Sequence, residues 1–186
     1  MKTILTVLAL ALAVVVPGLS VAAPALDPQN TLIMDTTKGQ VVIQLRPDLA
    51  PNHVARIKTL TSQGFYNGTP FHRVIPGFMA QGGDPTGTGR GGSSLPNLMA
   101  EFSQANFGRG TIGAARGDDP NSANSQFFIC YKDCSFLNGQ YTIWGQVVKG
   151  MNVVDKFAAG DPNVNDGQVA SPDKIIKMQI AADAKP

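Results

Sequence analysis

The side chains that most often perform acid–base, nucleophilic or metal chemistry are few in this sequence. It contains two histidines, His53 and His72, and two cysteines, Cys130 and Cys134. The C-x3-C spacing of the cysteines matches neither a C-x2-C redox pair nor a four-ligand zinc set. A Ser-His-Asp or Cys-His triad is a spatial arrangement that spacing alone does not reveal. We therefore expect no metal and no cofactor, and hydrolase chemistry has no support.

A glycine-rich segment at residues 87–92, GTGRGG, satisfies the G-x-G-x-x-G pattern of dinucleotide-binding loops. In those proteins the pattern opens a helix within a βαβ unit. No helical pattern opens after this segment and no βαβ unit surrounds it. We interpret it as a flexible glycine loop.

An arginine set among apolar residues occurs in residues 71–84, FHRVIPGFMAQGGD. Three further segments follow it: GTIGAAR at 110–116, NSQFFI at 124–129 and FLNG at 136–139. In order and in approximate spacing, the four segments resemble the signature motifs of the cyclophilins, a family of peptidyl-prolyl cis/trans isomerases. The resemblance extends over about residues 31–181.

This resemblance implies a closed eight-stranded antiparallel β-barrel capped by two α-helices, and an enzyme that acts on X–Pro bonds in proline-containing polypeptides. Arg73 occupies the catalytic position. The residues at the substrate-binding positions are Phe78, Met79, Gln81, Ala115, Arg116, Phe128, Phe136, Leu137 and Tyr141. Thr88 is expected at the rim of the site. We interpret His72 as a buried, hydrogen-bonded structural residue and not as a catalytic base.

The arginine at position 73 suits this reaction. An X–Pro bond resists rotation because lone-pair donation from nitrogen gives it partial double-bond character, with a barrier of about 18–20 kcal/mol. At the twisted transition state the lone pair is localised on the prolyl nitrogen, which then accepts a hydrogen bond. A guanidinium donor fixed near that nitrogen binds the transition state selectively. The alternative is a proline-peptide binding module or holdase without significant catalysis, which would not need such a donor.

Two positions depart from many eukaryotic members of the family, which have Trp where this chain has Phe136 and His where it has Tyr141. The change to Phe136 removes an indole N–H donor, so we expect weak binding of cyclosporin. The change to Tyr141 is expected to alter substrate preference more than chemistry, because isomerisation needs no proton-transfer group.

Short apolar runs separated by Gly, Asn, Asp and Pro predict many short strands and two helices. The expected helices are residues 51–63 and 151–158, where apolar residues recur at helical spacing. The expected strands are residues 31–35, 40–45, 71–75, 78–81, 111–115, 126–130, 143–148 and 175–181. This pattern indicates a closed or nearly closed antiparallel barrel with helices at its ends.

The barrel core is expected to include Val42, Ile112 and Ile129. Two long loops, residues 82–107 and 159–174, have no predicted element. Loops of that length in a compact domain are usually functional or poorly ordered.

Length and composition favour one globular domain. The chain has 186 residues, of which 43% are hydrophobic and 15% charged, and this composition is far from that of a disordered chain. Its net charge of +2, without a Lys/Arg cluster, predicts no nucleic-acid partner. No exposed heptad pattern suggests assembly, so a monomer is expected.

The N-terminal segment has the pattern of a secretory signal peptide. Lys2 precedes an apolar run that is followed by small residues, and the run is shorter than a membrane span requires. We expect residues 1–22 to be the signal peptide and residues 23–186 to be the isomerase domain. The mature protein is then periplasmic or secreted and has no membrane contact.

An oxidising compartment permits a disulfide between Cys130 and Cys134. Cys130 ends a predicted strand, and residues four apart on an extended chain are too distant to bridge unless the chain turns sharply. Two buried or partly buried free thiols are slightly favoured over the disulfide. His53 lies among polar neighbours in a predicted helix and is expected to be solvated.

Overall fold

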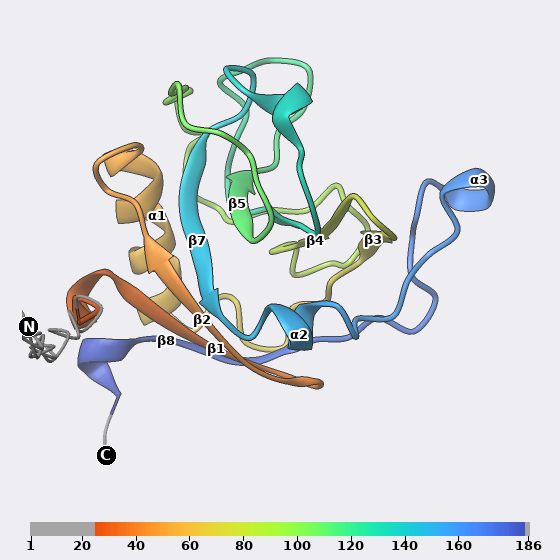
Figure 1. Ribbon diagram of the computed structural model, residues 1–186, viewed down its shortest axis with the longest axis horizontal. Coiled ribbons are helices and arrows are strands. Elements are labelled where there is room, and N and C mark those ends of the chain that lie inside the picture. The colour runs from red at the N-terminus through yellow and green to blue at the C-terminus, as the bar shows by residue number, and fades with distance from the viewer. Residues whose placement is uncertain (1–24, 185–186) are drawn as a thin grey trace, which may run out of the picture.

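The computed structural model describes residues 25–184, so the predicted signal peptide lies outside the described residues. Eight strands form one antiparallel sheet in the order β3-β4-β6-β5-β7-β2-β1-β8 (Figure 1). The strands are β1 (Thr31–Thr36), β2 (Gly39–Leu45), β3 (Arg73–Ile75), β4 (Met79–Gly82), β5 (Thr111–Ala114), β6 (Phe127–Cys130), β7 (Ile143–Lys149) and β8 (Ile175–Ile180). The helices are α1 (Pro51–Ser62), α2 (Met151–Val154) and α3 (Pro162–Asn165). Three short 3-10 helices are Pro28–Asn30, Ser135–Leu137 and Ala181–Asp183.

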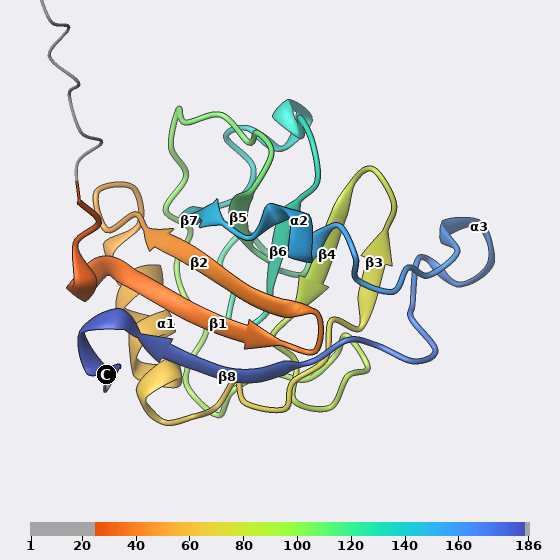
Figure 2. The same cartoon turned by 60° about the horizontal axis from the view of Figure 1, so that its bottom comes forward.

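The sheet curls until its two end strands approach each other. Strands β1 and β8 pair along their length, as Figure 2 shows, and β8 is the last strand on that side. Between β3 and the chain that leads into β8 there are two isolated bridges, Pro70 with Lys174 and Arg73 with Gln168. The prediction of eight antiparallel strands with helices is confirmed, but the predicted closure is incomplete. The sheet is a curled half-barrel, because these isolated bridges to the chain before β8 take the place of a continuous ladder between β3 and β8.

Alternation along β2 decides which residues enter the core. Val41, Ile43 and Leu45 are at most 2% exposed, whereas Val42 is only partly buried. The prediction that Val42 belongs to the core was wrong by one residue, because successive strand residues point to opposite faces. Ile112 and Ile129 are fully buried, as predicted.

Helix α1 agrees with its prediction to within one residue. Pro51 occupies its first turn, and Gly64, just beyond its C-terminal end, has a φ of +69°. Its apolar face packs against β7 and β8 and buries Val54, Ile57 and Leu60. The helix therefore closes one side of the core (Figure 1).

Helix α2 is shorter than predicted, because it ends at Val154 and not at residue 158. The next residues form a tighter turn, in which the Phe157 N–H donates to the Val154 carbonyl at 3.1 Å. The Ala158 N–H then donates to the Asp173 carboxylate at 2.8 Å and not to a carbonyl of the helix. Helix α3, which was not predicted, lies in the loop that follows. Among residues 25–184, no helix is long and apolar enough to cross a membrane.

Candidate functional site

A pocket of about 240 Å³ lies on the face of β4 and β6 that points away from the main core. Alternation creates this face: Ala80 and Ile129 point into the core, and Met79 and Phe128 point the other way. The pocket is lined by Arg73, Phe78, Met79, Gln81, Ala115, Arg116, Phe128, Leu137 and Tyr141. The structure thus brings together nine of the ten residues that the resemblance selected.

Phe136, the tenth residue, does not line the pocket. Its side chain is 63% exposed and its ring lies against Phe78, with 5.4 Å between the ring centroids. It stands next to Leu137 in the short 3-10 helix Ser135–Leu137, so it occupies the rim. The exposed ring is available to extend the apolar surface beyond the pocket.

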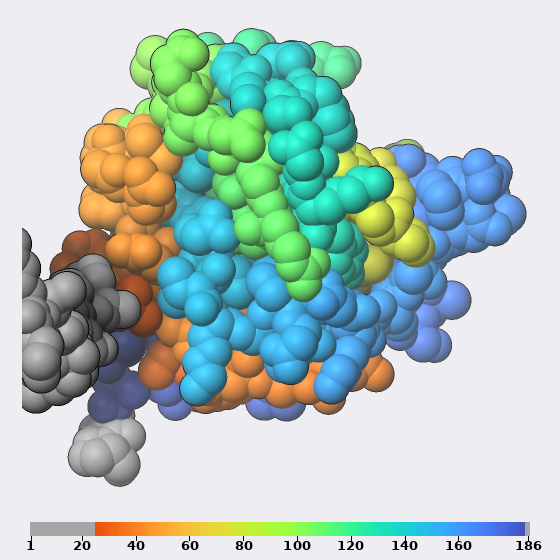
Figure 3. All heavy atoms as spheres, viewed as in Figure 1, coloured from red at the N-terminus to blue at the C-terminus, as the bar shows by residue number. Residues whose placement is uncertain are grey.

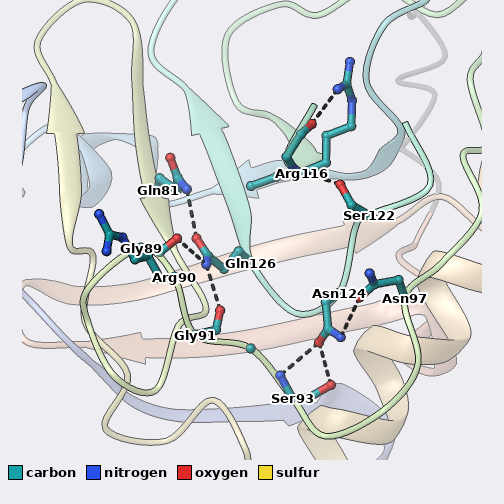
Figure 4. A pocket seen from close by; sticks show the side chains of 13 residues that line it. Gln81, Gly89, Arg90, Gly91, Ser93, Asn97, Arg116, Ser122, Asn124 and Gln126 are labelled. Atoms are coloured by element: carbon teal, nitrogen blue, oxygen red, sulfur yellow. Dashed lines mark hydrogen bonds between the residues drawn. The ribbon is translucent and has the colours of Figure 1, made fainter. Parts of the chain in front are cut away.

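Strand pairing places Arg73 at one side of the pocket. Arg73 on β3 stands opposite Gln81 on β4, and its Nη1 donates to Gln81 Oε1 at 3.3 Å. Gln81 Nε2 in turn donates to Gln126 Oε1 at 2.9 Å. Two carbonyls of the glycine-rich loop, those of Gly89 and Gly91, accept from Gln126 Nε2 at 3.0 and 2.8 Å (Figure 4). A chain of amide side chains therefore connects the guanidinium to that loop.

The glycine-rich loop is held in place by one buried carboxylate, that of Asp84. The backbone N–H groups of Thr86, Gly89 and Gly91 donate to it at 2.8, 2.7 and 3.1 Å. A Cβ added at Gly91 would lie 2.1 Å from Asp84 Oδ1, so glycine is required there. The segment is a loop, as predicted, but its backbone is anchored and not free. The sequence did not predict this role of Asp84, because nothing in the spacing around the last residue of the signature segment indicates that it binds the glycine-rich loop.

Arg116 and Tyr141 form the opposite side of the pocket. The Arg116 guanidinium lies 4.6 Å from the centre of the Tyr141 ring, and the Tyr141 ring meets Phe128 edge-on at 5.6 Å. Arg116 also donates from Nε and Nη2 to the Gln140 carbonyl, at 3.3 and 3.1 Å. Arg116 therefore fixes the aromatic wall as well as lining the pocket.

A second, more polar cavity of about 400 Å³ adjoins the first, and the two share Gln81, Ala115 and Arg116. Figure 4 shows side chains that line this second cavity. Asn124 organises its far wall, because its Oδ1 accepts from the Ser93 N–H at 2.9 Å and from the Ser93 hydroxyl at 2.7 Å. Together the two cavities form a surface long enough for more than one residue of a bound chain.

His72 is buried, as predicted, with 5% of its surface exposed. Neither of its ring nitrogens has a hydrogen-bond partner among the described residues, so the predicted hydrogen bond is not present. The ring faces the glycine-rich loop, where a Cβ on Gly89 would lie 3.5 Å from its Nε2. Burial lowers the pKa of His72, and the nearby Asp84 carboxylate only partly offsets this effect. Thr88 lines a further cavity that also contains Arg73 and Asp166.

The prediction of a solvated His53 was wrong. Its side chain is 3% exposed, and its Nδ1 lies 2.6 Å from Glu101 Oε2. The local sequence is polar, but Glu101 arrives from the long loop at residues 82–107 and covers the ring. A contact between residues 48 positions apart leaves no signal in local spacing.

Cys130 and Cys134 are both free and both buried, the alternative that the sequence slightly favoured. They pack beneath the pocket with Met79, Phe107 and Phe128. Burial raises the pKa of both thiols. Residues 25–184 contain no group of three or more His, Cys, Asp and Glu side chains that could hold a metal ion.

The fold and the pocket define a β-barrel protein that can receive a compact apolar group beside a fixed cation. A family model, cyclophilin type peptidyl-prolyl cis-trans isomerase/CLD, matches residues 31–180. The probable peptidyl-prolyl cis-trans isomerase of Brucella suis biovar 1 (strain 1330) is 55% identical over 174 residues, 88% of each chain. The peptidyl-prolyl cis-trans isomerase-like 1 of Gibberella zeae is 36% identical over 155 residues, 81% of this chain and 94% of that protein.

Solved structures give the same result. Cyclophilin AquaCyp293 from Hirschia baltica has a TM-score of 0.76 at 29% identity and covers 87% of this chain and 77% of its own. A Cryptosporidium parvum cyclophilin type isomerase, crystallised in the presence of the dipeptide Ala-Pro, has a TM-score of 0.74 at 30% identity, over 81% of this chain and 98% of its own. The chain belongs to the cyclophilin type peptidyl-prolyl cis-trans isomerases. Its activity is peptidyl-prolyl cis-trans isomerisation. This favours an enzyme over the alternative of a binding module without significant catalysis.

Proposed function

We propose that this enzyme isomerises X–Pro bonds of exported polypeptides, with Arg73 as the catalytic donor. The observation that carries the proposal is the position of the Arg73 guanidinium, which borders a pocket walled by apolar side chains, those of Phe78, Met79, Phe128 and Leu137. These apolar walls suit the pyrrolidine ring of proline. The guanidinium beside them suits the prolyl nitrogen.

The donor acts selectively on the transition state. In the planar amide the prolyl nitrogen has no free lone pair, so a donor gains little from the ground state. In the twisted amide the lone pair is exposed and accepts from Arg73. An interaction that exists only in the transition state raises turnover without tightening substrate binding.

One hydrogen bond does not account for the whole acceleration. Raising the rate from about 10⁻² to about 10³ s⁻¹ requires roughly 7 kcal/mol, and one charge-assisted hydrogen bond contributes about 1.5–3 kcal/mol. The remainder is assigned to the apolar pocket, which holds the proline ring away from water while the preceding carbonyl rotates. Gln81, which accepts from Arg73 at 3.3 Å, is placed to hydrogen-bond the substrate backbone as well.

The remaining site residues are assigned to substrate contact. Ala115 and Arg116 lie where the pocket meets the polar cavity and would border the chain on one side of the proline. Tyr141, over whose ring the Arg116 guanidinium lies, would border the chain on that same side. The exposed Phe136 would contact the substrate at the rim beside Phe78. The relative crystallised with the dipeptide Ala-Pro supports a proline-containing ligand for this pocket.

The proposal of export rests on the sequence of residues 1–22, which has a basic start, a short apolar run and a small-residue end. The mature enzyme would then work as a periplasmic or secreted monomer and assist the folding of exported proteins. Intact-mass measurement of the exported protein should give a chain that begins near Ala23. An exported protein that retains Met1 would contradict this part of the proposal.

Refolding of a denatured polypeptide tests the folding role. The substrate should have a slow phase limited by X–Pro isomerisation, which takes tens of seconds without a catalyst. The purified mature protein should accelerate that phase when it is present far below the concentration of the substrate. Acceleration only at equimolar amounts would indicate a holdase and would overturn the proposal.

A further inference from the structure

A pinched loop, residues 160–167, projects from the barrel beside β3. It contains α3 and forms the protrusion at the right of Figure 3. At its base the Gly160 N–H donates to the Val74 carbonyl at 3.0 Å, and the Val74 N–H donates to the Gly167 carbonyl at 2.8 Å. The two ends touch: a Cβ on Gly160 would lie 2.2 Å from the Gly167 carbonyl oxygen. The loop is therefore attached to the strand residue that follows Arg73.

Internal hydrogen bonds fix the end of this loop. The Asp161 carboxylate accepts from the Asn163 N–H at 2.8 Å and caps α3. The Asp161 carbonyl accepts from the N–H groups of Asn165 and Gly167, both at 3.2 Å. Between these two donors stands Asp166, whose φ of 55° is the only positive value of a non-glycine residue among residues 25–184.

Asp166 accepts two hydrogen bonds from one edge of the Arg73 guanidinium. Arg73 Nε donates to the Asp166 carbonyl oxygen at 2.8 Å, and Arg73 Nη2 donates to Asp166 Oδ1 at 2.9 Å. The third nitrogen, Nη1, remains for Gln81 and the pocket, and its bond to Gln81 is longer, at 3.3 Å. Because the guanidinium is a rigid planar fork, fixing one edge fixes the direction of the other.

We propose that Asp166 is a positioning residue that holds the Nη1 edge of Arg73 toward the prolyl nitrogen. This inference rests on the proposed catalytic role of Arg73. A free arginine side chain has many rotamers, and restricting them before the substrate binds favours a rapid reaction. The Asp166 side chain is 78% exposed, so water and salt weaken its ion pair with Arg73. A moderate contribution to turnover is therefore expected.

Asp166→Gly removes the carboxylate but keeps the loop conformation, because glycine tolerates the left-handed backbone. The backbone carbonyl that accepts from Arg73 Nε is therefore retained. We expect kcat/KM for a prolyl peptide to fall roughly three- to tenfold, mainly in kcat, with KM little changed. Asp166→Asn retains a side-chain oxygen at Oδ1 and should recover part of the loss. Asp183→Asn removes an equally negative, exposed side chain far from Arg73 and serves as the matched control, with unchanged turnover.

A double-mutant cycle with Arg73→Ala identifies the route of the effect. If Asp166 acts through Arg73, Asp166→Gly should cause no further loss in the Arg73→Ala background. The inference is overturned if Asp166→Gly keeps wild-type kcat, or if its loss persists unchanged without Arg73. If Asp166→Gly fails to fold, the same cycle is run with Asp166→Asn. We then expect a smaller loss of kcat that disappears in the Arg73→Ala background. Near-full turnover of Arg73→Ala alone would instead overturn the proposed function.

Discussion

The His53 ring and the Glu101 carboxylate form a pair at the N-terminus of α1, with 2.6 Å between Nδ1 and Oε2. Glu101 also accepts from the backbone N–H groups of Asn52 and His53, at 3.0 and 2.9 Å. The N-cap residue of α1, Ala50, has no side chain able to cap the helix. Glu101 therefore replaces the missing cap and attaches the long loop at residues 82–107 to the helix.

Glu101→Ala should lower the free energy of unfolding by about 1.5–3 kcal/mol, because the exposed helix donors lose a charged acceptor. At roughly 2–4 °C per kcal/mol, Tm should fall by several degrees. Thermal unfolding followed by circular dichroism measures the change. Glu101→Gln keeps one acceptor oxygen, so its Tm should lie between those of the wild type and Glu101→Ala. A Glu101→Ala variant as stable as wild type would refute the capping role.

The stability should also fall on mild acidification. Burial lowers the pKa of His53, and the Glu101 carboxylate only partly offsets this effect; His72 shifts in the same direction. Below the ordinary histidine pKa of about 6.5, the unfolded chain binds protons that the folded chain does not, so the free energy of unfolding decreases as pH falls from 7 to 5.5. Urea unfolding at several pH values tests this.

Glu101 adds a second phase at lower pH. Burial opposes its ionisation, but hydrogen bonds from His53 and from the backbone outweigh burial and hold its pKa below the ordinary value. The contribution of ionised Glu101 to the free energy of unfolding is therefore present above the ordinary glutamate pKa of about 4.3. It is lost as pH falls through the pKa that Glu101 has in the folded protein. His53→Asn should reduce the slope between pH 7 and 5.5 and leave the part of the acid phase that the backbone N–H donors of Asn52 and His53 supply. A slope that does not change in the variant would show that His53 is not its source.

Cyclosporin should bind weakly compared with Trp-bearing relatives. Phe136 is exposed at the rim beside Phe78 and has no N–H donor. Phe136→Trp should tighten binding by roughly two- to tenfold, the net value of one hydrogen bond. The variant also gains an exposed indole, whereas the one native tryptophan, Trp144, is buried, so fluorescence titration can follow binding. Low-nanomolar affinity of the unaltered protein would contradict this prediction.

The native protein should contain two unreactive thiols. Cys130 and Cys134 are both 0% exposed and burial raises the pKa of each, so little thiolate is available. A colorimetric thiol reagent should react slowly with the folded protein and with two groups after denaturation. An intact mass two units lower, with no thiol released on unfolding, would show a disulfide instead.

The sequence predicted the strands, helix α1 and nine of the pocket residues because each depends on local spacing or on contiguous signature segments. It did not predict the contacts that long loops make with distant elements. Glu101 reaches His53 across 48 residues and Asp166 reaches Arg73 across 93. Neither acidic residue has a distinctive neighbour in the sequence. Their partners are decided by how the loops close over the finished barrel.

We propose that Arg73 donates to the prolyl nitrogen at the twisted transition state. The most direct test of this proposal is kcat/KM of Arg73→Ala for a Pro-containing chromogenic peptide in a protease-coupled assay, with circular dichroism to confirm that the barrel is folded. We expect kcat/KM to fall by at least about a hundredfold, or roughly 2.7 kcal/mol, while peptide binding changes much less, and we expect little recovery in Arg73→Lys. Near-full turnover of a folded Arg73→Ala variant would contradict it, since the pocket would then act by confinement and desolvation alone.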